Sequence, residues 1–320
     1  MISVIVPNYN HAQFLKQRID SVLNQTYNDL ECIILDDCSI DNSKEIIELY
    51  RNHPKVKHIE YNIQNCGSTF KQWQKGISLS EGEFIWIAES DDWAEPDFLE
   101  KTYSKFHEDD ELGLVYCNSN MFINNVLTTT LSDVKTGILK NNKWTSDYLN
   151  DGIFELKDSL VLCCSINNAS AVLFKKKVLL NASPFDINFK YLGDWYCYLK
   201  IASISKVAYI NIPLNNYRDH KDNASKKAFE SFNHLTEYFL IYDWIFKNIY
   251  IKNKKQVLSF FDGYTKHTMS LFNKNQRKIY KDLYKINKKL FLHMIEFKTL
   301  TKMHNLLKSI KSIYFKVEHV

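Results

Sequence analysis

The chain has 320 residues, of which 45% are hydrophobic and 24% are charged, the balance of an ordinary globular protein. This length allows one large domain or two smaller ones with ample core. Eight glycines and five prolines exclude a collagen-like chain, and no stretch approaches the roughly 20 apolar residues that span a bilayer. The seven cysteines form no CxxC pair, which favours a reducing, cytoplasmic compartment over a disulfide scaffold.

Strands and helices alternate over the first part of the sequence. Short apolar runs predict strands at residues 3–7, 31–35, 56–61 and 84–87, with amphipathic helices between them. This alternation predicts βαβ units, and hence an α/β, Rossmann-like fold with a mostly parallel sheet flanked by helices. Because such crossovers are right-handed, the C-terminal strand ends share one edge of the sheet. Asn8, Asp36, Asp37 and the carboxylates after residue 87 would therefore converge on one crevice.

The middle of the chain is harder to interpret. A helix is predicted from Pro96 to about residue 107, then strands near residues 114–118, 171–174 and 206–212, the last ended by Pro213. A helix is expected to open near Asp194. Residues 119–160 have little periodicity and many Asn and Thr, so we expect loops over a binding site, or an insertion that shapes an acceptor site. We place a domain boundary at residue 226, which separates residues 1–226 from a helical, basic C-terminal region, residues 227–320.

Charge is distributed unevenly between the two parts. Residues 1–246 hold 24 Lys and Arg against 33 Asp and Glu, a net charge of −9, whereas residues 247–320 hold 17 against 4, a net charge of +13. A basic tail suggests a polyanionic partner such as a membrane surface, and the sequence contains no nucleic-acid recognition motif. From Leu300 the apolar residues fall on one face of a predicted helix. That helix would lie on the inner face of an anionic membrane, or pack on neighbouring helices or a second copy of the chain.

Three carboxylates, Glu89, Asp91 and Asp92, follow the apolar strand at residues 84–87. Carboxylates this close repel one another unless a positive charge lies between them. Mn²⁺ or Mg²⁺ holding a phosphate is the usual solution, because these ions prefer oxygen ligands. The alternative is a solvated acidic turn before the next helix.

Four stretches in this order resemble the motifs of the family 2 glycosyltransferases, which have the GT-A fold. They are VIVPNYNHAQFLKQRIDSVLNQTYNDLECIILDDCSIDNS from residue 4, the acidic stretch ESDDW, GDW at residues 193–195, and YRDHKDNAS at residues 217–225. The last is similar to a motif of bacterial cell-surface polysaccharide and teichoic-acid transferases. Together they cover about the first 225 residues.

The resemblance implies a role for each matching residue. Pro7 and Tyr9 would line the base pocket, Asp37 would accept a hydrogen bond from a uracil N–H, Asp91 would hold the ribose, and Arg218 would contact phosphate. Asp92 and His220 would bind the cation, and Asp194 would be the general base. Helix capping is the alternative for Asp36, Asp37 and Asp194, and a solvated surface loop is the alternative for Arg218 and His220. Trp73 is assigned to the core, and the other nine histidines are given no role.

The resulting expectation is a metal-dependent, inverting glycosyltransferase that moves a sugar from a UDP-sugar to a glycan, glycolipid or cell-wall polymer in surface polysaccharide synthesis. Nucleotidylyl transfer is a rival, but it would usually require a Gly-rich, basic loop, which PNYNHAQF is not. A non-catalytic nucleotide-sugar-binding or scaffold subunit of a polysaccharide assembly complex is the other alternative. The presence of both Asp92 and Asp194 argues against it.

Overall fold

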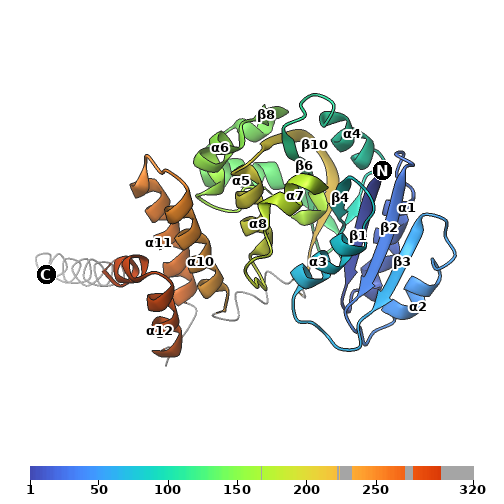
Figure 1. Ribbon diagram of the computed structural model, residues 1–320, viewed down its shortest axis with the longest axis horizontal. Helices are drawn as coiled ribbons and strands as arrows, with labels where there is room; N and C mark the ends of the chain where they lie inside the picture. The colour runs from blue at the N-terminus through green and yellow to red at the C-terminus, as the bar shows by residue number, and fades with distance from the viewer. Residues whose placement is uncertain (167, 222, 224–232, 271–276, 297–320) are drawn as a thin grey trace, which may run out of the picture. The chain divides into compact units, whose positions relative to one another are not determined.

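The computed structural model of the chain describes residues 1–166, 168–221, 223, 233–270 and 277–296 (Figure 1). Its contacts divide the chain into two compact units, Met1–Lys226 and Lys227–Val320. The first unit is built on a ten-stranded sheet, and the described part of the second is helical.

Four parallel strands form the N-terminal part of the sheet, in the order β3-β2-β1-β4. They are β1 (Ile2–Asn8), β2 (Leu30–Asp36), β3 (Val56–Tyr61) and β4 (Phe84–Ile87). Helices α1 (Ala12–Leu23), α2 (Ser43–Glu48) and α3 (Thr69–Leu79) connect them. Every residue of β1, β2 and β4 is buried, which explains why their apolar runs are nearly continuous rather than alternating. These elements lie together at the blue end of the ribbon (Figure 1).

The rest of the sheet continues in the order β9-β6-β10-β5. Its strands are β5 (Trp93–Ala94), β6 (Leu112–Ile123), β9 (Val172–Lys175) and β10 (Lys206–Asp219), with α4 (Phe98–Lys105), η3 (Ala169–Ala171), α7 (Lys176–Ala182) and α8 (Gly193–Ala202) between them. β9 runs antiparallel to both of its neighbours, whereas β10 is parallel to β6. The predicted α/β fold class is confirmed, and the sheet is mixed because β9 enters it from the opposite direction.

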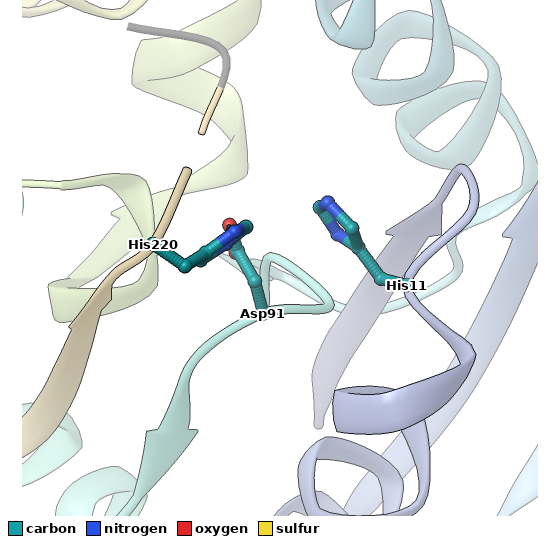
Figure 2. Close-up of side chains that lie close together, drawn as sticks. All are labelled: His11, Asp91 and His220. Carbon is teal, nitrogen blue, oxygen red and sulfur yellow. Dashed lines mark hydrogen bonds and ion pairs between the residues drawn. The ribbon is translucent and has the colours of Figure 1, made fainter. Parts of the chain in front are cut away.

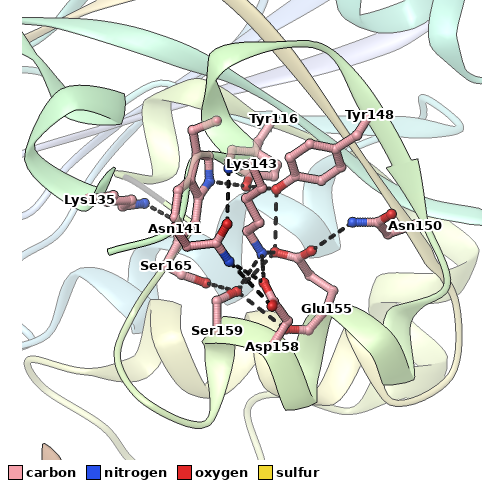
Figure 3. A network of polar contacts seen from close by, with 11 residues as sticks. Tyr116, Lys135, Asn141, Lys143, Tyr148, Asn150, Glu155, Asp158, Ser159 and Ser165 are labelled. Carbon is pink, nitrogen blue, oxygen red and sulfur yellow. Dashed lines mark hydrogen bonds and ion pairs between the residues drawn. The ribbon is translucent and has the colours of Figure 1, made fainter. Parts of the chain in front are cut away.

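The expectation that residues 119–160 form loops is wrong for most of that segment. β6 extends to Ile123, and short elements follow it: β7 (Val126–Thr130), α5 (Leu131–Leu139), η1 (Lys143–Thr145), β8 (Tyr148–Asn150), α6 (Gly152–Glu155) and a π-helical turn, η2 (Leu156–Leu160). Their stability comes partly from polar contacts, which apolar periodicity does not reveal. Glu155 is fully buried, and its Oε1 lies 2.7 Å from Lys143 Nζ, which also lies 2.9 Å from Asp158 (Figure 3).

β10 continues through Pro213, which we expected to end it. The register with β6 shifts on both sides of Pro213, so the proline lies at a bulge where its missing N–H costs no ladder bond. The strand therefore runs on to Asp219 and carries Arg218 to the sheet edge.

The second unit contains α10 (Asn233–Asn248), α11 (Lys254–Ser270) and α12 (Arg277–Ile286). Aromatic side chains pack between α10 and α11, and the rings of Tyr238 and Tyr264 stack with centroids 3.8 Å apart. Among the described helices, none has the length and apolar content to cross a membrane. The amphipathic helix predicted from Leu300 lies outside the described residues.

Candidate active site

The C-terminal ends of β1, β2 and β4 meet at one edge of the sheet, as predicted. β1 lies between the other two strands, and its register pairs Asn8 with Asp36 and Ile5 with Ile87. The loops that leave these three ends carry the polar residues singled out from the sequence. This edge is where ligands bind in open α/β sheets.

The turn after β1 is tied to the turn after β2. The Asn8 side chain donates to Asp36 Oδ1 at 2.8 Å, and the Ser39 hydroxyl donates to the same oxygen at 2.6 Å. Asp36 therefore holds two loops together and does not cap α2, whose N-cap is Asn42. Pro7 is buried in β1, whereas Tyr9 is 45% exposed, which leaves its ring accessible as a stacking face.

The Asp37 carboxylate is buried and accepts several hydrogen bonds from the protein. Its Oδ1 receives Asn62 Nδ2 at 2.6 Å and both Cys66 N and Gln72 Nε2 at 2.9 Å. These three donors use that oxygen fully, and Oδ2 accepts Cys66 N and Cys66 Sγ, both at 3.1 Å, so a ligand N–H would have to share Oδ2 with Cys66. Asp37 thus fixes the segment from residue 62 to residue 66 beside the sheet edge, in addition to any contact with a base.

The acidic loop, Glu89 to Asp92, follows β4 and encloses a buried positive charge. Arg18 of α1 is fully buried, and its Nε donates to the Glu89 carbonyl at 2.8 Å. Burial and the charge of Asp91 raise the pKa of Glu89 to about 8. Burial lowers the pKa of Arg18 to about 10 although the carboxylates oppose the shift, so this guanidinium stays charged at neutral pH.

Helix α3 contacts the acidic loop as well as Asp37. Trp73 Nε1 donates to Glu89 Oε1 at 2.8 Å, and Thr69 Oγ1 donates to the same oxygen at 3.3 Å. Trp73 is buried, as expected, but its indole N–H also positions a carboxylate. Glu89 is therefore held by protein donors, and it supports the loop that carries Asp91.

Asp91 lies between two histidines. His220 Nε2 is 3.1 Å from Asp91 Oδ2, and one ligand atom from each of His11, Asp91 and His220 lies within 4.8 Å of the others. Figure 2 shows the three side chains converging from separate segments. Burial raises the pKa of Asp91, but the hydrogen bond with His220 and the nearness of His11 outweigh it and keep the pKa below the ordinary value. These residue types and separations suit a divalent cation.

Asp92, the cation ligand expected from the sequence, accepts hydrogen bonds from the protein instead. It is 2% exposed, its Oδ1 accepts the backbone N–H of Arg218 at 3.0 Å, and its Oδ2 accepts the amide of Asn168. Burial and the charge of Asp91 raise its pKa. The structure therefore brings Asp91, not Asp92, into the group that could hold a cation.

Arg218 is a buried clamp rather than part of a surface loop. Its guanidinium carbon lies 4.3 Å from the Phe14 ring centroid and 4.5 Å from that of Trp93. Nη2 donates to Gln17 at 2.8 Å, and Nη1 donates to the Asp91 carbonyl. With both terminal nitrogens bonded to protein, Arg218 positions Asp91, and the expected contact with phosphate would have to use the second N–H of these nitrogens.

Asp194 lies in the first turn of α8 and is not its N-cap, which is Leu192. Its Oδ1 accepts the backbone N–H of Trp195 at 2.8 Å. Burial raises the pKa of Tyr198, one turn further along α8, and the charges of Asp194 and Glu89 raise it further. Next to Asp194, Gly193 faces Phe70 of α3, the helix whose Trp73 donates to Glu89, so the expected base lies at the start of a helix that packs on α3.

Four site residues were not predicted from the sequence: His11, Arg18, Gln72 and Asn168. His11 had a signal, because it lies in the segment just after the first strand, at the shared edge. The contacts of the other three depend on packing between distant segments, and no local pattern marks them.

Comparison with known proteins places this geometry in a family. The sequence model described as glycosyl transferase family 2 matches residues 3–170 of the 320. The chain is 27% identical over 231 residues to chondroitin synthase of Escherichia coli, a match that covers 72% of this chain and 30% of that protein. It is 27% identical over 280 residues to an uncharacterized glycosyltransferase, RT0329, of Rickettsia typhi, with 86% and 80% covered.

The chain spans only about a third of the length of two relatives. It covers 30% of the chondroitin synthase and 36% of another relative, glycosyltransferase GlyG of Streptococcus pneumoniae. Among solved structures, residues 1–349 of S. aureus TarS in complex with UDP have a TM-score of 0.65 at 18% identity, covering 92% of this chain and 82% of that one. The mannosyltransferase PcManGT from Pyrobaculum calidifontis, in complex with GDP-Man and Mn²⁺, has a TM-score of 0.56 at 16% identity, with 98% and 79% covered. These likenesses establish the fold. With the family model matching over half of its length, the chain belongs to glycosyl transferase family 2.

Proposed function

We propose that this glycosyltransferase transfers a sugar, with inversion, from a UDP-sugar to a glycan, glycolipid or polymer acceptor in surface polysaccharide synthesis. The observation that carries the proposal is the convergence of Tyr9, Asp37 and the acidic loop on one sheet edge, with Asp194 at the start of α8, beside the glycine that faces α3. The relatives in polysaccharide synthesis and the TarS complexes with UDP and UDP-GlcNAc support the donor class.

The nucleotide would bind at the ends of β1 and β2. Tyr9 has an accessible ring for stacking on a base, and Pro7 supports the floor of that pocket from within β1. Asp37 is held rigidly by three donors, so its Oδ2 would meet a uracil N–H at a fixed position. Arg218 would keep Asp91 in place beside the diphosphate.

The diphosphate would lie against the cation site. Asp91 and His220 provide a carboxylate and an imidazole already within 3.1 Å of each other, and the Mn²⁺ in the PcManGT structure supports such a site in this fold. When bound, Mn²⁺ or Mg²⁺ would stabilise the negative charge of the departing diphosphate. Asp92 and Arg18 would maintain the shape and charge of the loop that presents Asp91.

Asp194 would act as the general base. Its carboxylate takes the proton of the acceptor hydroxyl, the hydroxyl oxygen forms a bond to the anomeric carbon, and the bond from that carbon to UDP breaks on the opposite face. The first turn of a helix suits this anion, because backbone N–H groups and the helix dipole stabilise negative charge there.

Asp194→Asn tests this assignment while preserving the shape of the side chain. Because general-base catalysis typically contributes about 10²- to 10⁴-fold, turnover should fall by that factor while UDP-sugar affinity changes little. Stopped-time sugar-transfer assays and calorimetric UDP-sugar titrations on the same preparation separate the two effects. Near-normal turnover in the variant would move the base elsewhere. Wild-type protein that binds a UDP-sugar but transfers nothing to any acceptor would support the non-catalytic alternative.

We further propose that residues 247–320 bring the catalytic unit to the cytoplasmic face of an anionic membrane, directly or as a homo-oligomer. The net charge of +13 over residues 247–320 supports this, because each basic residue near such a surface contributes about 1 kcal/mol. All seven cysteines are described and free, as in a reducing compartment. A lipid-linked acceptor would be found at that surface.

A further inference from the structure

We propose that His11 is a third protein ligand of the cation site, and that the resulting His–Asp–His donor set makes the enzyme favour Mn²⁺ over Mg²⁺. This inference deepens the proposed function and rests on its cation site. It concerns His11, to which the sequence alone assigned no role.

The position of His11 is built into the sheet edge. It follows the turn after β1 and directly precedes α1, whose first N–H, that of Ala12, donates to Asp41 at 2.9 Å. The start of the helix is therefore anchored next to His11. The rings of His11 and His220 are 5.5 Å apart and nearly perpendicular, at 85°. Two imidazoles in this arrangement can direct nitrogens at one point beside Asp91 (Figure 2).

Ser90 orients the His11 ring. Ser90 Oγ is 2.8 Å from His11 Nδ1 and is itself 2% exposed, within the same loop that presents Asp91. Histidines that bind metals commonly use their second ring nitrogen for such a contact, which fixes the tautomer and aims the other nitrogen at the ion. The Ser90 contact would thus make Nε2 the coordinating atom. One four-residue loop provides both a ligand and the support for another ligand.

The donor set carries the preference among ions. Mg²⁺ is bound by oxygen ligands, keeps several waters, and takes one or two carboxylates with the substrate phosphates. Imidazole nitrogen is a ligand of the first-row transition ions, a series to which Mn²⁺ belongs, as its weakest-binding member, and Mg²⁺ does not. Two histidines with one carboxylate form a set that Fe²⁺ uses with positions left open. The remaining positions would be available to the diphosphate. Replacing one imidazole should therefore weaken Mn²⁺ binding more than Mg²⁺ binding.

The test measures cation binding to the full-length protein, without turnover. Mn²⁺ is titrated in the presence of UDP by calorimetry and by the loss of the free-ion electron paramagnetic resonance signal, and Mg²⁺ is then added as a competitor. The variants are His11→Asn, Ser90→Ala, and His107→Asn as a matched control on an exposed histidine outside the site. We expect His11→Asn to lose at least tenfold in Mn²⁺ affinity and to narrow the Mn²⁺/Mg²⁺ preference. Ser90→Ala should show a smaller loss, and His107→Asn should show none.

Unchanged Mn²⁺ affinity and an unchanged Mn²⁺/Mg²⁺ ratio in His11→Asn would overturn the inference. If that variant does not fold, pulsed resonance of Mn²⁺ bound to the wild-type protein decides the question: ¹⁴N coupling from two imidazoles supports the proposal, and coupling from one overturns it. The proposed function fails separately, when wild-type protein does not bind UDP or binds it equally well with Mn²⁺ and with EDTA.

Discussion

Arg18 illustrates how single residues balance charge at this site. It is fully buried, and its Nε donates a hydrogen bond. Its Nη1 and Nη2 have no hydrogen-bond partner among the described residues. An unpaired charge in a protein interior is costly, and the carboxylates of the acidic loop are what offset it. Arg18 and the loop therefore stabilise each other.

Asp91 and Asp92 are neighbours with different partners, and their replacement should separate binding from stability. Asp91→Asn removes a charged oxygen from the candidate cation site, so we expect the enhancement of UDP affinity by Mn²⁺ to disappear with little change in folding.

Asp92→Asn places an amide against the amide of Asn168. We expect it to lower the free energy of unfolding by about 1–3 kcal/mol. Calorimetry with Mn²⁺ or EDTA, together with urea denaturation, provides both measurements. Loss of Mn²⁺-dependent UDP binding in Asp92→Asn alone would return the cation to Asp92.

At the scale of elements, α3 connects the two halves of the site. Adjacent residues of this helix donate to different strand ends, Gln72 to Asp37 after β2 and Trp73 to Glu89 after β4. The helix can approach the sheet this closely because Gly76 faces Ile5 of β1, where an added Cβ would lie 2.4 Å from Ile5 Cγ2.

Gly76→Ala should therefore push α3 away from β1. We expect a loss of about 1–3 kcal/mol in the free energy of unfolding, because overpacking a rigid core is destabilising. UDP affinity should also fall, since Asp37 loses a correctly placed partner. Gly137→Ala in α5 is the matched control: nothing lies within 4 Å of its added Cβ, so better helix propensity should raise stability slightly. Chemical denaturation of both variants measures the difference, and equal effects would rule out the packing argument.

Lys135 of α5 makes stability depend on pH. Its Nζ donates to the Ser165 carbonyl, and burial lowers its pKa from 10.5 to about 7. In the unfolded chain the amine holds its proton up to the higher value. The destabilisation is therefore complete below pH 7 and is relieved as pH rises from about 7 to 10.5.

Lys135→Met should raise the free energy of unfolding at pH 7 and remove this contribution. Between pH 7 and pH 9 the wild-type protein should gain up to about 2 kcal/mol relative to the variant, given 1.36 kcal/mol for each pKa unit. Urea denaturation at the two pH values provides the comparison, in which other titrating groups cancel. A constant difference between the two proteins would show that Lys135 keeps its proton in the folded state throughout this range, so that its pKa is not lowered.

At the scale of the whole molecule, what the sequence predicted depended on apolar patterning. β1, β2 and β4 are fully buried and read as continuous apolar runs, so their shared edge and its carboxylates followed from topology. Residues 119–160 did not, because Glu155 and Lys143 stabilise that segment through contacts invisible to periodicity. The sequence marked His11 only by its place near the end of the first strand, and its contact with Ser90, 79 residues away, could not be predicted.

The uneven charge of the chain leads to a prediction for the whole molecule. Replacing Lys302, Lys308, Lys311 and Lys316 by Gln removes four positive charges without shortening the chain. We expect sedimentation with anionic vesicles at low salt to fall sharply, while binding to neutral vesicles stays negligible for both proteins. Equal, negligible binding of the wild-type chain to either vesicle would leave these residues with a packing role.

The candidate cation ligands are distant in sequence, with Asp91 and His220 129 positions apart, so only the folded chain can assemble them. On the proposed function, donor and cation would bind the native state alone. At a hundred times its dissociation constant a ligand then adds about 2.7 kcal/mol to the stability of the native state. The nucleotide-sugar pool would thus govern how long each enzyme molecule survives as well as how fast it works. A cell short of donor would lose both activity and protein.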